Sequence, residues 1–200
     1  MATPLVPVTL LGSYVRLEPL TRAHCEPLGQ VALDPAIWRW TLRALNTVQD
    51  VERYIDLALD LQAAGVTLPF ATVAVSDNRV VGSTRFQHIE CAHRRLEIGD
   101  TWVAPPWQRT AINTEAKYLM LQYAFEILHY QRVEFRTDAL NARSRAAIRR
   151  IGATEEGCLR RQAITDTGRV RDTMCYSILD VEWPEVKSTL AYKLGIRETR

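Results

Sequence analysis

The sequence predicts an α/β fold in which a mixed, mostly antiparallel sheet is flanked by helices. Hydrophobic residues make up 47% and charged residues 24% of the chain, which is typical of a globular protein and excludes disordered and fibrous classes. Helical and strand patterns alternate along the 200 residues without internal repeats, low-complexity tracts or Gly/Ser linkers. A chain of this length buries enough surface for one core. We therefore expect a single domain over 1–200, with its core at about 10–180.

Hydrophobic periodicity and turn residues place each element. Thr47 and Asp50 form a capping-box pattern before apolar positions at helical spacing, which predicts a helix that Gly65 ends. Pro105 and Pro106 end a strand, because proline supplies no ladder donor. The expected order is a strand (15–17), a helix (21–33), an irregular stretch (34–46), the capped helix (47–65), three antiparallel strands (70–76, 80–86 and 96–103), a helix (through 116–127), a strand (133–138), a short helix (144–151), a hairpin (153–161 and 170–179) and a last helix (182–194).

Charge and targeting signals limit the class of protein. The net charge of +2 does not indicate wholesale binding to nucleic acid or to a membrane surface. No apolar run approaches the roughly 18 residues that span a bilayer, and Pro4 and Pro7 interrupt an N-terminus without the basic start of a signal peptide. The four cysteines lie far apart, which favours reduced thiols and a cytoplasmic location; they are Cys25, Cys91, Cys158 and Cys175.

Basic residues concentrate in one part of the chain. Residues 132–171 hold ten arginines and five acids, a net +5, and the remainder carries 15 basic and 18 acidic residues, a net −3. Guanidinium groups suit a phosphate-bearing ligand because their forked donors match phosphate oxygens. An arginine-rich surface is the alternative, and the cluster alone does not decide between them.

The segment 96–116 is the most informative one. A strand leads through a proline-containing loop into the start of a helix, where the first N–H groups lack partners and the helix dipole is positive. Such an end binds anions, with Asn113 or Thr114 as the expected cap and Arg109 as a nearby cation. The alternative is an ordinary capped helix. The chain lacks GxGxxG and a Walker lysine, which disfavours Rossmann and nucleotide triphosphatase sites.

This segment and the element order resemble the GNAT N-acetyltransferase superfamily, specifically its RimJ/RimL-like branch, which acts on ribosomal proteins. The acetyl-CoA motif of the family, Q/R-x-x-G-x-G/A, aligns with residues 108–113. Glu97-Ile-Gly, Asn141-Ala-Arg-Ser144, Ile151-Gly-Ala153 and the closing strand at 171–177 extend the resemblance over about 10–179. Ala111 and Asn113 replace both motif glycines; Asn tolerates a left-handed backbone, and Ala adds one methyl group near the pyrophosphate.

The resemblance implies acetyl-CoA as co-substrate and assigns roles to individual residues. The cofactor-binding set is Trp102, Val103, Gln108, Arg109, Thr110, Ala111, Ile112, Asn113, Thr114, Asn141 and Ser144. Glu97 is the expected base; its alternative is a strand carboxylate paired with Arg94 or Arg95. Asp100 ranks lower, because an odd separation from Glu97 places it on the opposite face of the strand.

Two further candidates could complete the chemistry. Ser144 is expected to hydrogen-bond or protonate the leaving sulfur, with a helix N-cap as its alternative. A turn residue is the corresponding alternative for Asn141. Tyr176 is a candidate acid, with core packing as its alternative.

Other side chains carry less information. His88, Glu90, Cys91 and His93 alternate in direction along an extended chain, so no metal site is expected. Cys91 lacks a recognisable partner pattern for a nucleophile. Trp38, Trp40 and the helix from Val51 are expected to wall the acceptor groove, with burial in the core as the alternative.

These observations predict an N-acetyltransferase that moves an acetyl group directly from acetyl-CoA to a primary amine, foremost a protein or peptide N-terminus. A small amine or antibiotic is the second acceptor class. A non-catalytic CoA-binding regulatory module, which the two replaced glycines support, is a rival function. An RNA-binding domain is disfavoured, because Phe135 is the one aromatic residue among the arginines of 132–171. The resemblance leaves a homodimer open.

Overall fold

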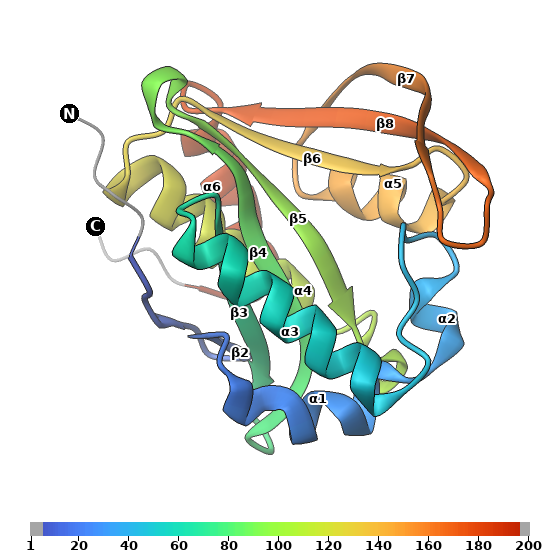
Figure 1. Ribbon diagram of the computed structural model, residues 1–200. Coiled ribbons are helices and arrows are strands. Elements are labelled where there is room, and N and C mark those ends of the chain that lie inside the picture. The colour runs from blue at the N-terminus through green and yellow to red at the C-terminus, as the bar shows by residue number, and fades with distance from the viewer. Residues whose placement is uncertain (1–5, 197–200) are drawn as a thin grey trace.

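One eight-stranded sheet organises the protein (Figure 1), whose computed structural model describes residues 6–196. The strand order is β1-β2-β3-β4-β5-β6-β8-β7, with β5 and β6 parallel and the other neighbouring pairs antiparallel. The mixed, mostly antiparallel sheet expected from the sequence is therefore confirmed. Its strands are β1 (Leu10–Leu11), β2 (Val15–Pro19), β3 (Thr67–Ala74), β4 (Arg79–Glu90), β5 (Arg95–Val103), β6 (Arg132–Asp138), β7 (Thr154–Ile164) and β8 (Val170–Leu179).

Helices cover both faces of the sheet. On one face α1 and α3 pack over a core that includes Leu28 and Ile55, and on the other α4 and α6 pack over a core that includes Met120 and Leu190. The helices are α1 (Cys25–Ala32), α2 (Pro35–Trp38), α3 (Val48–Ala63), α4 (Ala111–Gln122), α5 (Ala142–Arg150) and α6 (Trp183–Leu194). Short 3-10 turns are η1 (Arg22–His24), η2 (Cys91–His93) and η3 (Pro105–Trp107), and α4 continues as a π-helical turn, η4 (Tyr123–Ile127).

The helix starts confirm one expectation and correct two. Thr47 and Asp50 form the expected capping box of α3. By contrast, α4 begins earlier than expected, because the Thr110 side chain accepts the hydrogen bond from the Ile112 amide. Asn113 and Thr114 thus lie inside the first turn, and neither is its cap. The cap of α5 is Asn141, whose side chain accepts from the backbone N–H of Ser144, so the capping alternative for Ser144 is wrong.

A gap opens in the sheet between β5 and β6. These strands pair over three positions, the last of which joins Glu97 to Glu134. Beyond this pair, β5 continues to Val103 and β6 to Asp138, but the two strands no longer pair with each other, and Figure 1 shows them diverging. The gap has its narrow end at Glu97 and its wide end where the chain enters α4 and α5.

A bulge in β5 changes which side chains face the gap. The register shifts between Ser83 and Arg85 of β4, and Asp100 has a left-handed φ of 49°. Asp100 pairs with Arg85 at 2.5 Å, and Glu97 pairs with Gln87, two residues along the same strand. Residues two apart share a face, so Glu97 and Asp100 lie on one side of the sheet. The expectation that they lie on opposite faces is wrong, because the bulge interrupts the alternation.

Candidate active site

Glu97 lies at the narrow end of the gap, in the last pair that joins β5 to β6. Its side chain is almost completely buried, with 3% of the residue exposed. One carboxylate oxygen, Oε1, accepts a hydrogen bond of 2.8 Å from Gln87 Nε2. The other, Oε2, lies 3.4 Å from Arg136 Nε and has no hydrogen-bond partner among the described residues. The carboxylate is thus held by one oxygen, and the other is available to accept a proton.

The surroundings of Glu97 make it a stronger base than an exposed glutamate. Burial raises the pKa of the carboxyl group, and this outweighs the opposing effects of the Gln87 hydrogen bond and the Arg136 charge. Arg136 is a weak partner because it is 3.4 Å away without hydrogen-bond geometry and is shared with Glu134, 3.1 Å from its Nη2. Arg95 pairs instead with Glu90 and Glu134, and Arg94 Nη2 donates to Gln131 Oε1, so neither of the arginines expected to pair with Glu97 does so.

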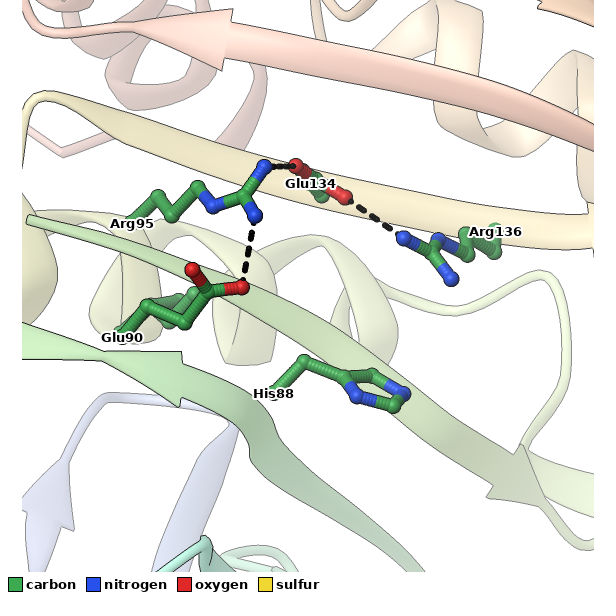
Figure 2. Close-up of a pocket in the computed structure, with 6 residues that line it drawn as sticks. His88, Glu90, Arg95, Glu134 and Arg136 are labelled. Atoms are coloured by element: carbon green, nitrogen blue, oxygen red, sulfur yellow. Dashed lines mark hydrogen bonds and ion pairs between the residues drawn. The ribbon is translucent and has the colours of Figure 1, made fainter. Parts of the chain in front are cut away.

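A small cavity of about 60 Å³ lies near Glu97, and its lining includes the adjacent residue Leu96 together with His88, Glu90, Arg95, Glu134 and Arg136. Figure 2 shows Arg95 bridging Glu90 and Glu134, with Arg136 on the far side of Glu134 and His88 apart from these ion pairs. The Nε2 atom of His88 is 3.8 Å from Glu97 Oε2, and the His88 side chain is 63% exposed. The exposed His88 ring thus lies close to Glu97 Oε2, which is itself buried.

The loop before α4 presents unpaired backbone amides at the wide end of the gap. The amides of Trp107 and Gln108 are used within the loop, by the carbonyls of Ala104 and Pro105. The next three amides, of residues 109–111, have no protein acceptor among the described residues. Arg109, with a φ of 63°, supplies the left-handed turn that sequence analysis placed at Asn113. Three open amides at the start of a twelve-residue helix form an anion site that suits a diphosphate.

Arginines of α5 add positive charge to this site. Arg143 Nη1 donates to Gln108 Oε1 at 2.6 Å, and Arg150 Nη2 donates to Thr114 Oγ1 at 3.0 Å. Neither guanidinium group forms an ion pair with a described carboxylate. Much of the 132–171 cluster is instead neutralised by neighbouring acids, as in the pair of Arg132 with Glu156. Two arginines from the cluster thus reach the anion site.

The remaining expected cofactor contacts line the same loop. Gln108 Nε2 donates to the Val103 carbonyl at 2.7 Å and so ties the loop to the end of β5. The Trp102 ring packs against Trp38 at 5.3 Å. The Ala104 amide donates to the Val81 carbonyl of β4, so by alternation the Trp102 backbone also faces β4 and the Val103 backbone faces the gap. Ile112 is buried in the core, and Asn113 Oδ1 is buried without a hydrogen-bond partner among the described residues.

The structure places Ser144 and Tyr176 differently relative to the gap. Ser144 lies in the first turn of α5, beside the wide end, and its hydroxyl has no hydrogen bond within the described chain. Tyr176 is fully buried; its phenol accepts from Arg145 and donates to Glu155. Because Tyr176 pairs with Phe135, which alternates in direction from Glu134, it lies on the face opposite Glu97. Tyr176 fits its core-packing alternative, and its role as an acid has no geometric support.

The tryptophans divide between the core and a second pocket. Trp38 is buried with its Nε1 donating to the Ala32 carbonyl at 2.6 Å, whereas the half-buried Trp40 lies between Arg39 and Arg169. A pocket of about 180 Å³ separates this segment from the tip of the β7–β8 hairpin, and Trp38 contributes to its wall. The Asp166 side chain accepts from the Ala44 amide at 2.8 Å, so the hairpin tip bridges to the α2 region.

Metal and membrane features are not seen in the described residues. Within 6–196, no three or more His, Cys, Asp and Glu side chains are grouped to hold a metal ion. No helix in the same part of the chain has the length and apolar character needed to cross a bilayer. All four cysteines are unpaired thiols.

Three features occur together: parallel strands that diverge, a buried carboxylate at the narrow end of the gap between them, and an anion-binding helix start at the wide end. This combination is typical of acyl-CoA-dependent transferases. The domain family described as "Acetyltransferase (GNAT) domain" matches residues 15–154, and the chain belongs to this family. It is 34% identical over 107 residues, 54% of its length, to the Bacillus subtilis protein named "Putative ribosomal N-acetyltransferase YdaF", and the match spans just over half, 57%, of that relative.

Solved structures show the same fold. A GCN5-related N-acetyltransferase from Brucella melitensis is 31% identical with a TM-score of 0.88, covering 98% of this chain and 89% of that one. Mycobacterium smegmatis RimJ, solved in complex with CoA-disulfide, is 24% identical with a TM-score of 0.78, covering 90% of this chain and 89% of its own. The GNAT family and fold expected from the sequence are confirmed, and the similarity to RimJ is a similarity of fold.

Proposed function

We propose that the protein transfers the acetyl group of acetyl-CoA directly to a primary amine bound in the gap between β5 and β6. The observation that carries this proposal is the placement of Glu97 and the open amides of residues 109–111 at opposite ends of one gap. Acetyl-CoA supplies the activated thioester. The amides and Arg109 hold its diphosphate. The side-chain Nδ2 of Asn141 is available to the pantetheine, because only the Oδ1 of that side chain is used, as the cap of α5.

Glu97 acts as the base. In the reaction the amine nitrogen bonds to the acetyl carbon, the carbon–sulfur bond breaks, and the amine proton moves to Glu97 Oε2, directly or through a water molecule. An α-amine, with an ordinary pKa of about 7.7–8.0, needs only a modest base, and the raised pKa of Glu97 narrows the difference between donor and acceptor. The Ser144 hydroxyl is available to hydrogen-bond the departing thiolate and to relay a proton to it from solvent, so that the serine ends the step as a hydroxyl.

The proposed acceptor is the N-terminus of a protein or peptide. Support comes from the name of the Bacillus subtilis relative, which refers to ribosomal N-acetylation. It also comes from chemistry, because an α-amine loses its proton more readily than a lysine amine with a pKa near 10.4. A small amine or antibiotic is the second acceptor class. Turnover of small amines without turnover of any peptide would favour that class.

The test compares Glu97→Gln with Glu90→Gln, a nearby carboxylate that is 42% exposed and paired with Arg95. Acetylation of a panel of N-terminal peptides and small amines is followed from pH 6 to 9. Glu97→Gln is expected to lower kcat by about a hundredfold or more at neutral pH, while acetyl-CoA affinity and Glu90→Gln stay near wild type. Equal rates for wild type and Glu97→Gln across this range would remove Glu97 as the base. Stabilisation by CoA without acetylation of any amine would favour the non-catalytic module.

A further inference from the structure

A largely buried arginine without a carboxylate partner lies near the wide end of the gap. Arg171 of β8 is 9% exposed, and its one hydrogen bond joins Nε to Thr173 Oγ1 at 3.1 Å. Thr173 in turn donates to Gln162 Oε1 at 2.9 Å, which fixes the hydroxyl as an acceptor for Arg171. The terminal nitrogens, Nη1 and Nη2, have no hydrogen bond or ion pair within the described chain. Neither terminal nitrogen belongs to the buried side-chain atoms that lack a partner, so both reach solvent and are available to a carboxylate that enters from there.

The position of Arg171 relates it to Glu97. Thr173 is opposite Asp138, the last residue of β6, so Arg171 lies just beyond the strand at the wide end of the gap. The bond from Nε to Thr173 turns the side chain back along β8, toward the narrow end. The charges of Asp138, Arg169 and Glu97 all act on the guanidinium group. Tyr176 lies on the face opposite Glu97, and Arg171 alternates from it along β8, so Arg171 and the base share one face of the sheet.

The nearby charges do not neutralise Arg171. Asp138 is the nearest carboxylate along the ladder, but its Oδ2 is bonded to Arg169 Nη2 and its Oδ1 accepts from the Leu140 amide. The Asp138 carboxylate is thus the nearest anion for both Arg169 and Arg171, and it pairs directly with Arg169. The positive charge of Arg171, which is buried, is left without an ion pair. Burial lowers the pKa of Arg171 and Asp138 partly offsets this, as expected for a cation that lacks its own partner.

We infer that Arg171 binds a carboxylate of the acceptor and so selects amines that carry an acidic group close to the reacting nitrogen. This inference rests on the proposed acetyl transfer to a primary amine. In an extended peptide each residue advances the chain by about 3.4 Å. The carboxylate would therefore belong to one of the first residues of an acidic N-terminus, or to a free amino acid. Both sources share the chemistry of a carboxylate bound by a guanidinium fork.

The test uses pairs of acceptors that differ only in this charge. Peptides with Asp or Glu at position 2 or 3 are compared with their Asn or Gln counterparts, and free amino acids with their amides. For the wild type we expect kcat/KM to favour the acidic member by on the order of tenfold or more. Arg171→Gln should reduce this preference to near one, Arg171→Lys should retain part of it, and Arg160→Gln, an exposed arginine on β7, should leave it unchanged. Preference within the free amino acids alone would identify a small acceptor, and within the peptides alone a protein N-terminus.

Two outcomes separate failure of the inference from failure of the proposed function. Equal kcat/KM for acidic and neutral acceptors in the wild type would overturn the inference while acetyl transfer stands. If no amine is acetylated, the proposed function fails, and calorimetry with the same peptides on the CoA-loaded wild type still decides the inference. Tighter binding of the acidic peptides would support it, and equal binding would overturn it. The wild-type comparison holds even if the Arg171 variants do not fold.

Discussion

Glu115 anchors the start of α4 to the first hairpin of the sheet, and its removal should cost the protein much of its stability. The carboxylate is 1% exposed and accepts three backbone hydrogen bonds, from Ser13 at 2.9 Å, Tyr14 at 2.6 Å and Val15 at 2.8 Å. Gly12 leaves room for it, since a Cβ there would lie 2.4 Å from the Glu115 carboxyl carbon. This one side chain thus joins residues about one hundred positions apart in the sequence.

The magnitude follows from these three bonds. A hydrogen bond to a charged group contributes about 1.5–3 kcal/mol, and an amide left buried without a partner adds a comparable penalty. In Glu115→Ala the amides of the exposed residues Ser13 and Tyr14 can turn to water, but that of the buried Val15 cannot. We expect a loss of about 3–5 kcal/mol, which for a domain of this size lowers Tm by roughly 10 °C.

Thermal and urea unfolding measure this loss, with Glu52→Ala on the exposed face of α3 as the matched control. Gly12→Ala should destabilise the protein by a similar route, because the added methyl displaces the carboxylate. A Glu115→Ala variant within 1 kcal/mol of the Glu52→Ala control would refute the reasoning, since surface substitutions alone cost about that little.

Three further predictions concern the gap and its supports. Gly99→Ala would place a Cβ 2.2 Å from Gln87 Nε2 and 2.6 Å from Glu97 Oε1 and so disturb the hydrogen bond between these two side chains. We expect kcat to fall at least about tenfold with unchanged acetyl-CoA affinity, and an unchanged kcat would contradict the role given to this bond. Arg109→Gly keeps the left-handed turn at φ 63° but removes the cation. Calorimetry should therefore show CoA binding weakened about fivefold, with the Tm of the protein unchanged. A large drop in Tm would show instead that the side chain stabilises the fold. Burial lowers the pKa of Lys117 to about 7, below its value in the unfolded chain. The unfolded state therefore binds more protons between pH 7 and 10, and the free energy of unfolding should rise with pH in this range. Urea unfolding should show a smaller rise for Lys117→Met, and an equal slope in both proteins would exclude Lys117 as its source.

The sequence predicted the elements and the family of this protein better than the geometry of its site. The capping box at Thr47 is local, so the start of α3 could be read directly. The start of α4 could not, because Thr110, Asn113 and Thr114 are all capable caps, and the choice depends on the turn that Arg109 makes. Three-dimensional packing decides between such equivalent local signals.

The partners of Glu97 depend on strand register, which sequence does not specify. Gln87 comes from the antiparallel neighbour and Arg136 from the parallel one, whereas the adjacent Arg94 and Arg95 were the expected partners. The bulge at Asp100 has no signal in its residue type, and it reverses the face on which Asp100 lies. The sequence places Arg171 among ten arginines and at the start of the closing strand, but its lack of an anionic partner becomes visible only when its neighbours are known.

A crystal structure of the protein with CoA tests the central claim most directly. We expect diphosphate oxygens within hydrogen-bonding distance of the amides of residues 109–111, and the thiol within the gap, on the path to Glu97 Oε2. A CoA molecule whose diphosphate lies away from the start of α4, or whose thiol is directed away from Glu97, would contradict it.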